Sequence, residues 1–298
     1  MSRILFSTCP VCDANAIVDV LQVKDYTVSG ESFTIAECSS CTLRFTKDAP
    51  GAATIAPYYK SENYISHTDT AKGVVNRVYH LVRKITLVQK RKLIEKATAI
   101  KSGSILDVGS GTGAFPNEMK QSGWKTTGLE PDADARKLAR DLYNLELNES
   151  THLYQLPVDH FDAITLWHVL EHVHDLAGYV QQLKRLLKSG GRIFIALPNY
   201  TSIDAAVYKE YWAAYDVPRH LYHFSPLSMQ VLMEKHGLKI MQHKPMWFDS
   251  FYISLLSNKY KHGKARWLTA VWNGLRSNLA AVGNRKKCSS VIYVIAKG

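Results

Sequence analysis

The chain has 298 residues, of which 46% are apolar and 21% are charged, a composition that excludes an intrinsically disordered protein. The length suits one large α/β domain with a small accessory module. No apolar run reaches the roughly 20 residues that a membrane-spanning helix needs, and residues 1–10 lack the apolar core of a secretory signal. We therefore expect a soluble protein of the cytoplasm.

The formal net charge of +11 is unevenly distributed along the chain. Residues 70–101 hold nine Lys/Arg and one Glu, and residues 251–298 hold nine Lys/Arg and no acidic residue. Such basic segments can face nucleic acid, an anionic membrane surface or an acidic substrate, and they can also be ordinary solvated helix faces. Charge alone does not choose among these partners.

Four of the five cysteines form two pairs near the N-terminus, Cys9-Pro-Val-Cys12 and Cys38-Ser-Ser-Cys41. Two Cys-x-x-Cys pairs at this spacing are typical of a closed structural Zn²⁺ site with four thiolate ligands. Two disulfides would suit an oxidising compartment, and a redox-active pair would not need a second copy. We predict a zinc-ribbon-like module of short strands over residues 1–45, because so short a segment cannot build a core of its own.

A linker with one long amphipathic helix, from about residue 72 to 97, follows in residues 46–99. From residue 100 on, short apolar runs alternate with helical patterns, which predicts a doubly wound, mostly parallel α/β sheet of seven strands. The expected strands cover residues 104–108, 125–129, 145–147, 161–166, 192–197, 238–241 and 290–296. The expected helices cover residues 114–122, 132–143, 176–188, ended by Gly190-Gly191, and 226–236, with Ser225 as the N-cap.

A helical insert, residues 249–288, separates the last two expected strands within the domain of residues 100–298. Apolar residues recur in it at helical spacing, at Leu268, Val271, Trp272, Leu275, Leu279 and Val282. The pattern predicts an amphipathic helix near the open edge of the ligand-binding site. This basic insert, with Trp267 and Trp272, could rest on an anionic membrane surface, or it could be an ordinary packing helix.

A glycine-rich turn follows the first strand of the alternating region, as Asp107-Val-Gly109-Ser110-Gly111-Thr-Gly113. Glycine at alternate positions lets the chain turn sharply and lets a ligand approach the backbone, and the helix that follows offers free N–H groups. The spacing differs from the G-x-G-x-x-G fingerprint of dinucleotide-binding proteins, and no Lys stands where a P-loop needs one. Glu130, at the end of the second strand, can accept hydrogen bonds from two ribose hydroxyls.

Five segments carry a family resemblance and occur in the expected order. They are I-L-D-V-G-S-G-T-G (105–113), G-L-E-P (128–131), F-D-A-I-T-L-W-H-V-L-E-H-V (161–173), L-L-K-S-G-G-R-I-F-I-A-L-P-N (186–199) and H-L-Y-H-F-S-P (220–226). Over about residues 100–245 the chain resembles the class I S-adenosylmethionine (SAM)-dependent methyltransferases, in particular the ubiquinone-biosynthesis O-methyltransferase branch. These segments are specific for the cofactor and say little about the acceptor.

The resemblance implies a role for each residue of the cofactor site. The turn residues that would surround the methionine end of SAM are Asp107, Gly109, Ser110, Gly111 and Gly113. Glu130, followed by Pro131, would hold the ribose. The segment around Ser150 would flank the adenine, with Glu149 as the one acidic candidate for its amino group. Trp167 and His168 would line the floor near the methyl group.

Transfer of a methyl group to a neutral hydroxyl also requires removal of a proton, and histidine suits this task because its pKa lies near neutrality. The catalytic candidates are His168, His220 and His223. His220 and His223 lie three residues apart in a loop-like stretch with Arg and aromatic residues, which predicts a wall of the acceptor site. His172, which follows the fourth strand, is instead expected to be structural or solvated.

These features predict a methyltransferase for a small-molecule acceptor, with O-methylation of a sugar, a lipid-linked compound or a quinone-like compound all open. An RNA or protein methyltransferase is an alternative, which a zinc ribbon and a basic chain would suit. Against it, no Asn/Asp-Pro-Pro-aromatic segment follows the fourth strand, and Cys288 is the one cysteine left for pyrimidine C5 chemistry. A domain that binds the cofactor without catalysis is a third alternative.

Overall fold

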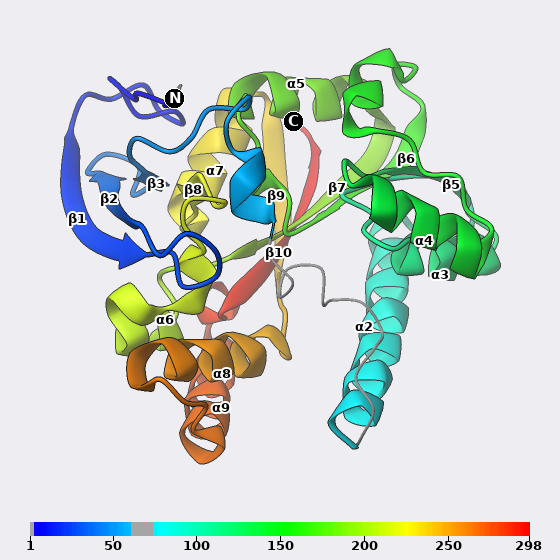
Figure 1. Ribbon diagram of the computed structural model, residues 1–298. Helices are drawn as coiled ribbons and strands as arrows, with labels where there is room; N and C mark the ends of the chain where they lie inside the picture. The colour runs from blue at the N-terminus through cyan, green and yellow to red at the C-terminus, as the bar shows by residue number, and fades with distance from the viewer. Residues whose placement is uncertain (1–2, 61–73) are drawn as a thin grey trace.

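The computed structural model describes residues 3–60 and 74–298, and its central feature is a six-stranded sheet with helices on both faces (Figure 1). The strands are β4 (Ser104–Val108), β5 (Lys125–Leu129), β6 (Phe161–Trp167), β7 (Leu187–Pro198), β9 (Leu238–Pro245) and β10 (Ser290–Lys297). Their order is β5-β4-β6-β7-β10-β9. The pairs β5–β4, β4–β6 and β6–β7 are parallel, whereas β10 is antiparallel to both neighbours. The predicted doubly wound, mostly parallel α/β fold is confirmed.

The third expected strand, residues 145–147, does not form a ladder. An isolated parallel bridge joins Leu129 of β5 to Asn148 instead. The main sheet therefore has six strands among the described residues, where seven were expected, and a single bridge stands at the edge where the seventh was predicted.

The helix expected over residues 176–188 is shorter than predicted and is not ended by Gly190-Gly191. It is α5 (Leu176–Leu186), and the next residue already begins β7. Leu187 is fully buried and pairs with Phe161 of β6, and the two glycines lie where the register of this pair of strands shifts. Strand pairing between distant segments thus overrides the local helical pattern.

The other helices of this domain cover the two faces of the main sheet. They are α2 (Val74–Thr98), α3 (Ala114–Gln121), α4 (Ala133–Tyr143) and α7 (Pro226–Lys235). Leu106 and Val108 of β4 share a buried cluster with α5 and α7, whereas Ile105 shares one with α2 and α3. Ser225 caps α7 as predicted, within a capping box. The predicted start of α2, at residue 72, lies outside the described residues.

The N-terminal segment forms a small sheet that residues far along the chain complete. Its strands are β1 (Ile17–Lys24), β2 (Ser32–Cys38), β3 (Arg44–Thr46) and β8 (Tyr222–His223), in that order. Strand β3 pairs with β8 through Arg44–His223 and Phe45–Tyr222. The buried side chains of the cysteine segment belong to the same cluster as those of the main sheet. The N-terminal segment and the large domain therefore share one core.

The insert between β9 and β10 forms two helices, α8 (Asp249–His262) and α9 (Trp267–Gly283), beside the short helix α6 (Ile203–Tyr208). The face of α9 that is buried consists of small and polar residues, namely Ala270, Asn273, Gly274, Ser277 and Ala281. Asn273 and Ser277 donate hydrogen bonds to Tyr208 Oη (2.9 Å) and Asp204 Oδ1 (2.7 Å). The predicted helix is present, but its apolar stripe faces solvent. Among the described residues, no helix is both long enough and apolar enough to cross a bilayer.

Short 3₁₀ helices join these elements at several points: Ala56–Tyr59, Ser150–Gln155, Leu170–His172, Lys209–Tyr211, Ala213–Tyr215 and Arg285–Lys287. One of them, Leu170–His172, directly follows β6. It therefore stands at the carboxyl end of a central parallel strand, where doubly wound sheets bind their ligands.

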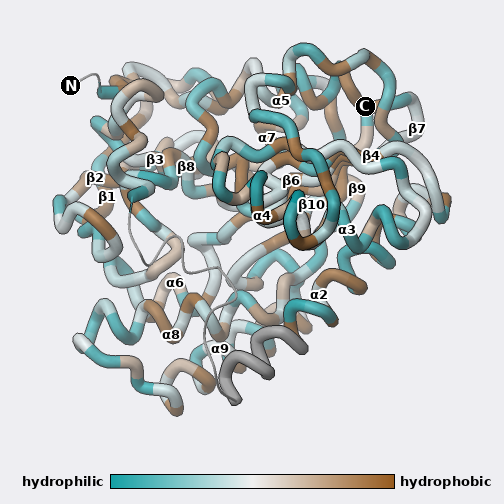
Figure 2. The backbone as a smooth tube through the Cα atoms, turned by 45° about the vertical axis from the view of Figure 1, so that its right-hand side comes forward, coloured by the Kyte–Doolittle hydropathy of each residue, from teal (hydrophilic) through white to brown (hydrophobic). Residues whose placement is uncertain are grey.

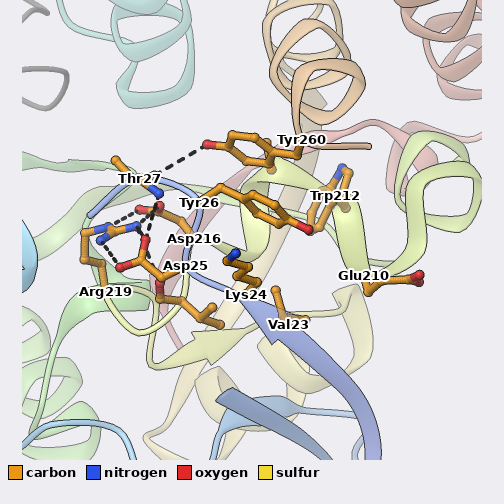
Figure 3. A pocket seen from close by; sticks show the side chains of 12 residues that line it. Val23, Lys24, Asp25, Tyr26, Thr27, Glu210, Trp212, Asp216, Arg219 and Tyr260 are labelled. Atoms are coloured by element: carbon orange, nitrogen blue, oxygen red, sulfur yellow. Dashed lines mark hydrogen bonds and ion pairs between the residues drawn. The ribbon is translucent and has the colours of Figure 1, made fainter. Parts of the chain in front are cut away.

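A buried arginine joins the N-terminal segment to the loop that precedes β8 (Figure 3). Arg219 is 1% exposed and donates from Nη2 to Asp25 Oδ1 (2.9 Å) and to Asp216 Oδ1 (2.6 Å), and from Nη1 to the carbonyl oxygen of Tyr58 (2.9 Å). Burial alone would raise the pKa of Asp25, but the hydrogen bonds from Arg219 and from the Ser29 N–H hold it below its usual value. The guanidinium thus lies between two carboxylates from distant parts of the chain.

Replacement of Arg219 by methionine should lower the free energy of unfolding by about 3–5 kcal/mol, because it leaves two carboxylates without their buried partner. Urea unfolding of the full chain measures this loss. Lys235→Ala is the matched control, since the Lys235–Asp13 pair is solvent-exposed and should contribute less than about 1 kcal/mol. Equal losses in the two variants would contradict the role assigned to Arg219.

Candidate functional site

The glycine turn after β4 has a backbone that requires glycine at three positions. Gly109, Gly111 and Gly113 have φ values of +71°, +52° and +80°. A Cβ atom at Gly109 would lie 2.5 Å from Val169 Cγ2, whereas one at Gly111 would have no atom of the described residues within 4 Å. Gly109 is therefore needed for close packing, and Gly111 borders open space where a ligand can approach the backbone.

Glu130, the residue predicted to bind the ribose, contacts this turn. Its Oε2 accepts a hydrogen bond from the Gly111 N–H (2.7 Å) and its Oε1 accepts one from the Asp132 N–H (3.0 Å). Burial raises the pKa of Glu130. Arg136 donates to the carbonyl oxygens of Glu130 and Pro131 and so holds the end of β5. Each carboxylate oxygen keeps a lone pair for a further donor.

Asp107, at the start of the turn, is 2% exposed and accepts a hydrogen bond from Thr165 Oγ1 (2.6 Å). Burial raises the pKa of Asp107 to about 7. Ser110 Oγ donates to the carbonyl oxygen of Asp107 (2.9 Å) and closes the turn. Because burial disfavours the charged carboxylate, a cationic ligand beside Asp107 would stabilise that charged form.

Trp167 and His168 stand together at the end of β6. The indole Nε1 of Trp167 is buried without a hydrogen-bond partner among the described residues, and Lys90 Nζ lies 4.1 Å from the centroid of the indole ring. Burial lowers the pKa of Lys90 to about 8. Lys90 carried no signal in the sequence, because it is one of several cations on α2 and no pattern distinguishes it.

His168 has a positive φ of +59° and is held between two carboxylates. Its Nε2 lies 3.0 Å from Asp249 Oδ2 and its Nδ1 lies 3.4 Å from Glu171 Oε1. Burial opposes its charge, but the two carboxylates raise the pKa of His168 to about 10. His168 is therefore protonated at neutral pH, and it cannot accept the proton of an acceptor hydroxyl as its predicted catalytic role requires. Asp249, the first residue of α8, carried no signal in the sequence.

His220 keeps one ring nitrogen available. Its Nδ1 lies 2.9 Å from the carbonyl oxygen of Ala214, which can only accept, so Nδ1 carries a proton. Its Nε2 lies 4.0 Å from Glu171 Oε1 and 4.0 Å from Asp216 Oδ2. Of the three predicted catalytic histidines, His220 has the geometry that best suits proton or metal chemistry.

His223 lies elsewhere than predicted. It is 4% exposed on β8, its Nε2 lies 3.2 Å from Thr46 Oγ1, and its ring packs against Tyr215. Burial holds the pKa of His223 well below its usual value. This position between β3 and β8 makes His223 a packing residue and does not support its predicted catalytic role.

The segment predicted to flank an adenine lies beside Glu130. The Glu130 N–H donates to the carbonyl oxygen of Asn148 (2.9 Å), and Ser150 begins the next 3₁₀ helix. The carboxylate of Glu149 is solvent-exposed and lies 3.1 Å from Arg136 Nη2. Glu149 is thus engaged at the surface, which weakens it as a partner for the adenine amino group.

The four N-terminal cysteines form one compact cluster. The Sγ atoms of Cys9 and Cys41, and those of Cys12 and Cys38, are each 3.5 Å apart, and all four lie within 4.8 Å of one another without a disulfide. A Zn²⁺ ion with Zn–S bonds of about 2.3 Å separates its tetrahedral sulfurs by about 3.8 Å. The four thiols therefore fit a zinc ion with little movement.

A family described as "Methyltransferase domain" matches residues 82–243, more than half of the chain. The chain belongs to this family of methyltransferase domains. The predicted membership of the class I SAM-dependent methyltransferases, and with it the enzyme class, is confirmed.

The matches to curated relatives cover only part of this chain and only part of each relative. The ubiquinone biosynthesis O-methyltransferase of Sodalis glossinidius is 32% identical over 115 residues, 36% of this chain and 46% of that protein. The protein of the same name from Serratia proteamaculans is 28% identical over 151 residues, 45% of this chain and 62% of that protein. The chain thus matches less than two thirds of the length of each.

A solved structure supports the fold of the methyltransferase domain. Magnesium protoporphyrin IX methyltransferase from Synechocystis PCC 6803, with bound SAH, superposes with a TM-score of 0.52 at 12% sequence identity. The match covers 81% of this chain and 97% of that one. At this identity the likeness concerns the fold alone.

Proposed function

We propose that this methyltransferase domain binds SAM and transfers its methyl group to a hydroxyl oxygen of a small-molecule acceptor. One observation carries the proposal: in a domain of this family, the Gly111 N–H donates to the carboxylate of Glu130, while the Cβ side of Gly111 is open among the described residues. The partial matches to O-methyltransferases favour oxygen as the acceptor atom. The acceptor itself stays open among sugars, lipid-linked compounds and quinone-like compounds.

The proposed site assigns each residue a binding task. Asp107 would face the cationic methionine end of the cofactor, and Glu130 would accept the ribose hydroxyls. Trp167 would form the floor near the methyl group, because its indole lies at the end of β6 with Lys90 over it. When bound, SAM supplies a methyl group already activated on a sulfonium, so the protein's main contribution is alignment of the acceptor.

The reaction would form a bond between the acceptor oxygen and the methyl carbon as the bond from carbon to sulfur breaks, with its electron pair staying on sulfur, and the hydroxyl proton would pass to a nearby base. Burial and the neighbouring His220 lower the pKa of His172 to about 4, so His172 is a weak base, and His168 is already protonated. We therefore assign His220, whose Nε2 lies near two carboxylates, as the base that accepts the proton of the acceptor hydroxyl.

We further propose that Cys9, Cys12, Cys38 and Cys41 hold a structural Zn²⁺ ion. The cluster is mostly buried, which suits a closed, non-catalytic site. Thr42, next to Cys41, makes a hydrogen bond of 2.6 Å to Ser225 Oγ, the N-cap of α7. The ion would thereby stabilise the contact between the N-terminal segment and the large domain.

The solvent-exposed face of α9 is proposed to rest on an anionic lipid surface. Its large apolar residues are exposed, with Leu268 at 89% and Trp272 at 61%; the others are Trp267, Val271, Leu275, Leu279 and Val282. Basic residues lie before and after the helix, at Lys261, Lys264, Arg266, Arg285, Lys286 and Lys287, and residues 251–298 hold no acidic residue. This combination is typical of helices that lie in the membrane interface.

The charge of this face argues against a second copy of the chain as its partner, because two copies would bring like charges together. Helices α8 and α9 project on the same side of the molecule as α2, as both views show (Figures 1 and 2). A lipid surface there would lie beside the helix that carries Lys90, and it would suit an amphiphilic acceptor.

Binding of SAM should tighten roughly tenfold between pH 5.5 and pH 7, as measured by calorimetry. The pKa of Asp107 is raised to about 7, so Asp107 is mostly protonated at pH 5.5 and must release its proton to face a cation. Binding should therefore release protons at the lower pH. The Asp107→Asn variant should bind SAM more weakly and lose this pH dependence, whereas a wild-type affinity that does not change with pH would contradict the assignment.

Incubation of the full chain with isotopically labelled SAM and cell extract, followed by mass spectrometry, identifies the acceptor. Glu130→Ala should bind SAM at least about tenfold more weakly, because it removes a charged hydrogen-bond acceptor. Glu234→Ala, at an exposed glutamate on α7 outside the proposed site, is the matched control and should bind nearly as well as wild type. Absence of any SAM binding by the wild-type chain would overturn the proposed function.

The chain should co-sediment with vesicles of phosphatidylcholine and phosphatidylglycerol and should remain free with phosphatidylcholine alone. Leu279→Asp should weaken binding about tenfold or more, since it places a charge on the lipid-facing side of α9. Leu142→Asp is the control, because Leu142 is an exposed leucine on α4, away from α9. A salt-resistant dimer in light scattering, with no binding to anionic vesicles, would contradict the lipid assignment.

A further inference from the structure

A basic hollow, lined by Lys184, Arg185, Lys235, His236 and Lys297, lies at the end of the main sheet where the parallel strands begin. It has a volume of about 770 Å³, which is large enough for a small molecule. Because β10 is antiparallel to β7, its carboxyl end lies at this end of the sheet, whereas the glycine turn follows the carboxyl end of β4. The basic hollow is therefore separate from the proposed SAM site.

The lining of the basic hollow carries an excess of positive charge. It includes four cations and a single carboxylate, Asp159, which forms an ion pair with Lys297 (2.6 Å). Lys184 and Arg185 form no ion pair within the part of the chain that the structure describes. Both side chains donate to backbone carbonyl oxygens, which carry no net charge. These two positive charges therefore remain uncompensated at the wall of the hollow.

His236 adds an unsatisfied ring nitrogen to the basic hollow. It is the C-cap of α7, and its Nε2 is buried without a hydrogen-bond partner in the described part of the chain. Burial and the charges of Lys235 and Lys184 lower the pKa of His236, so the imidazole is mostly neutral at neutral pH. When Nε2 carries the proton, it can donate to an anionic oxygen, which would remove the cost of leaving it unpaired.

Cations near helix C-termini also offset the helix dipole, and those of the basic hollow belong to the last turns of α5 and α7. That role accounts for each cation singly. It does not account for their gathering around one hollow beside an unpaired imidazole nitrogen. Gly237 has a φ of +64°, and a Cβ atom there would lie 2.7 Å from Lys184 Nζ. The glycine therefore lets the ammonium group lie close to the backbone between the two helix ends.

We propose that the basic hollow binds a free phosphorylated small molecule, a phosphate monoester or a diphosphate, through donors on Lys184, Arg185 and His236. Arg and Lys are the usual partners of phosphate oxygens, and each has N–H groups left for a ligand. Two carboxylates flank the hollow through their ion pairs with its other two lysines, and they would repel an extended polyanion such as RNA. The charge of the site thus suits a compact anion.

The place of the basic hollow in the molecule favours a free compound over a lipid headgroup. Helix α5 and the carboxyl end of β10 lie at the opposite end of the molecule from α8 and α9, as both views show (Figures 1 and 2). A membrane in contact with α9 would leave the hollow facing away from it. The phosphorylated compound would also differ from the methyl acceptor, because the SAM site lies at the other end of the parallel strands.

Calorimetric titration of the full chain with inorganic pyrophosphate at physiological salt tests the site. We expect one equivalent to bind, and saturation of the chain with SAM should leave this binding unchanged, because the two ligands would use different residues. Absence of saturable binding, or competition by SAM, would overturn the proposal. Neither outcome bears on the proposed function, which the separate SAM titration decides.

Lys184→Met and Arg185→Gln should each weaken pyrophosphate binding at least about tenfold, because each removes a charged donor. Lys125→Gln should bind as the wild type does, since Lys125 is an exposed lysine on β5, at the far edge of the same sheet. SAM binding should persist in all three variants and shows that they are folded. Wild-type affinity for pyrophosphate in both hollow variants would contradict the assignment.

Two further measurements distinguish the sources of the phosphate. Arg185→Gln should co-sediment with phosphatidylglycerol vesicles as the wild type does, and a loss of this binding would assign the hollow to a lipid headgroup and overturn the free compound. Single-stranded RNA should bind no more tightly than pyrophosphate. Tighter, steeply salt-dependent RNA binding that both hollow variants weaken would overturn the proposal in favour of nucleic acid.

Discussion

The buried Arg219 guanidinium, held between Asp25 and Asp216, is the contact on which the arrangement of the site depends. One carboxylate belongs to the turn after β1 and the other to the loop before β8, so a single side chain joins the N-terminal segment to the large domain. The next residue, His220, faces Glu171. A desolvated cation tolerates little displacement of its partners, because each must stay within hydrogen-bond distance. The hydrogen bonds that Arg219 makes to Asp25 and Asp216 thus hold the position of the adjacent His220.

The N-terminal segment is part of the structural support of this site. Strand β3 pairs with β8, the cysteine cluster shares its core with the main sheet, and Thr42 is hydrogen-bonded to the cap of α7. Two of the histidines in the loop before α7 consequently have different environments although they are three residues apart. His220 points to the buried carboxylate of Glu171, whereas His223 is enclosed between the two parts of the protein.

The insert shows that buried polar groups can decide which face of a helix packs against the protein. Helix α9 packs through Asn273 and Ser277 because Tyr208 and Asp204 are buried and need hydrogen-bond partners. Gly274 allows close approach to Phe251 on the same side. The large apolar residues are left exposed to solvent, on a helix that projects on the same side of the molecule as α2 (Figure 1). A face of this kind is typical of an interaction site, and its basic surroundings favour the proposed anionic lipid surface.

The sequence by itself determined the alternating α/β order, the glycine turn, Glu130 and the four-cysteine cluster, because periodicity, glycine spacing and cysteine spacing are local properties. It also indicated the cap at Ser225. Only the tertiary structure decided that β7 begins at Leu187, that α9 is turned outward, that His168 is locked as a cation by Asp249, and that Glu171 meets two histidines. Each of these depends on contacts between residues far apart in the chain, whose burial and charge no local pattern encodes.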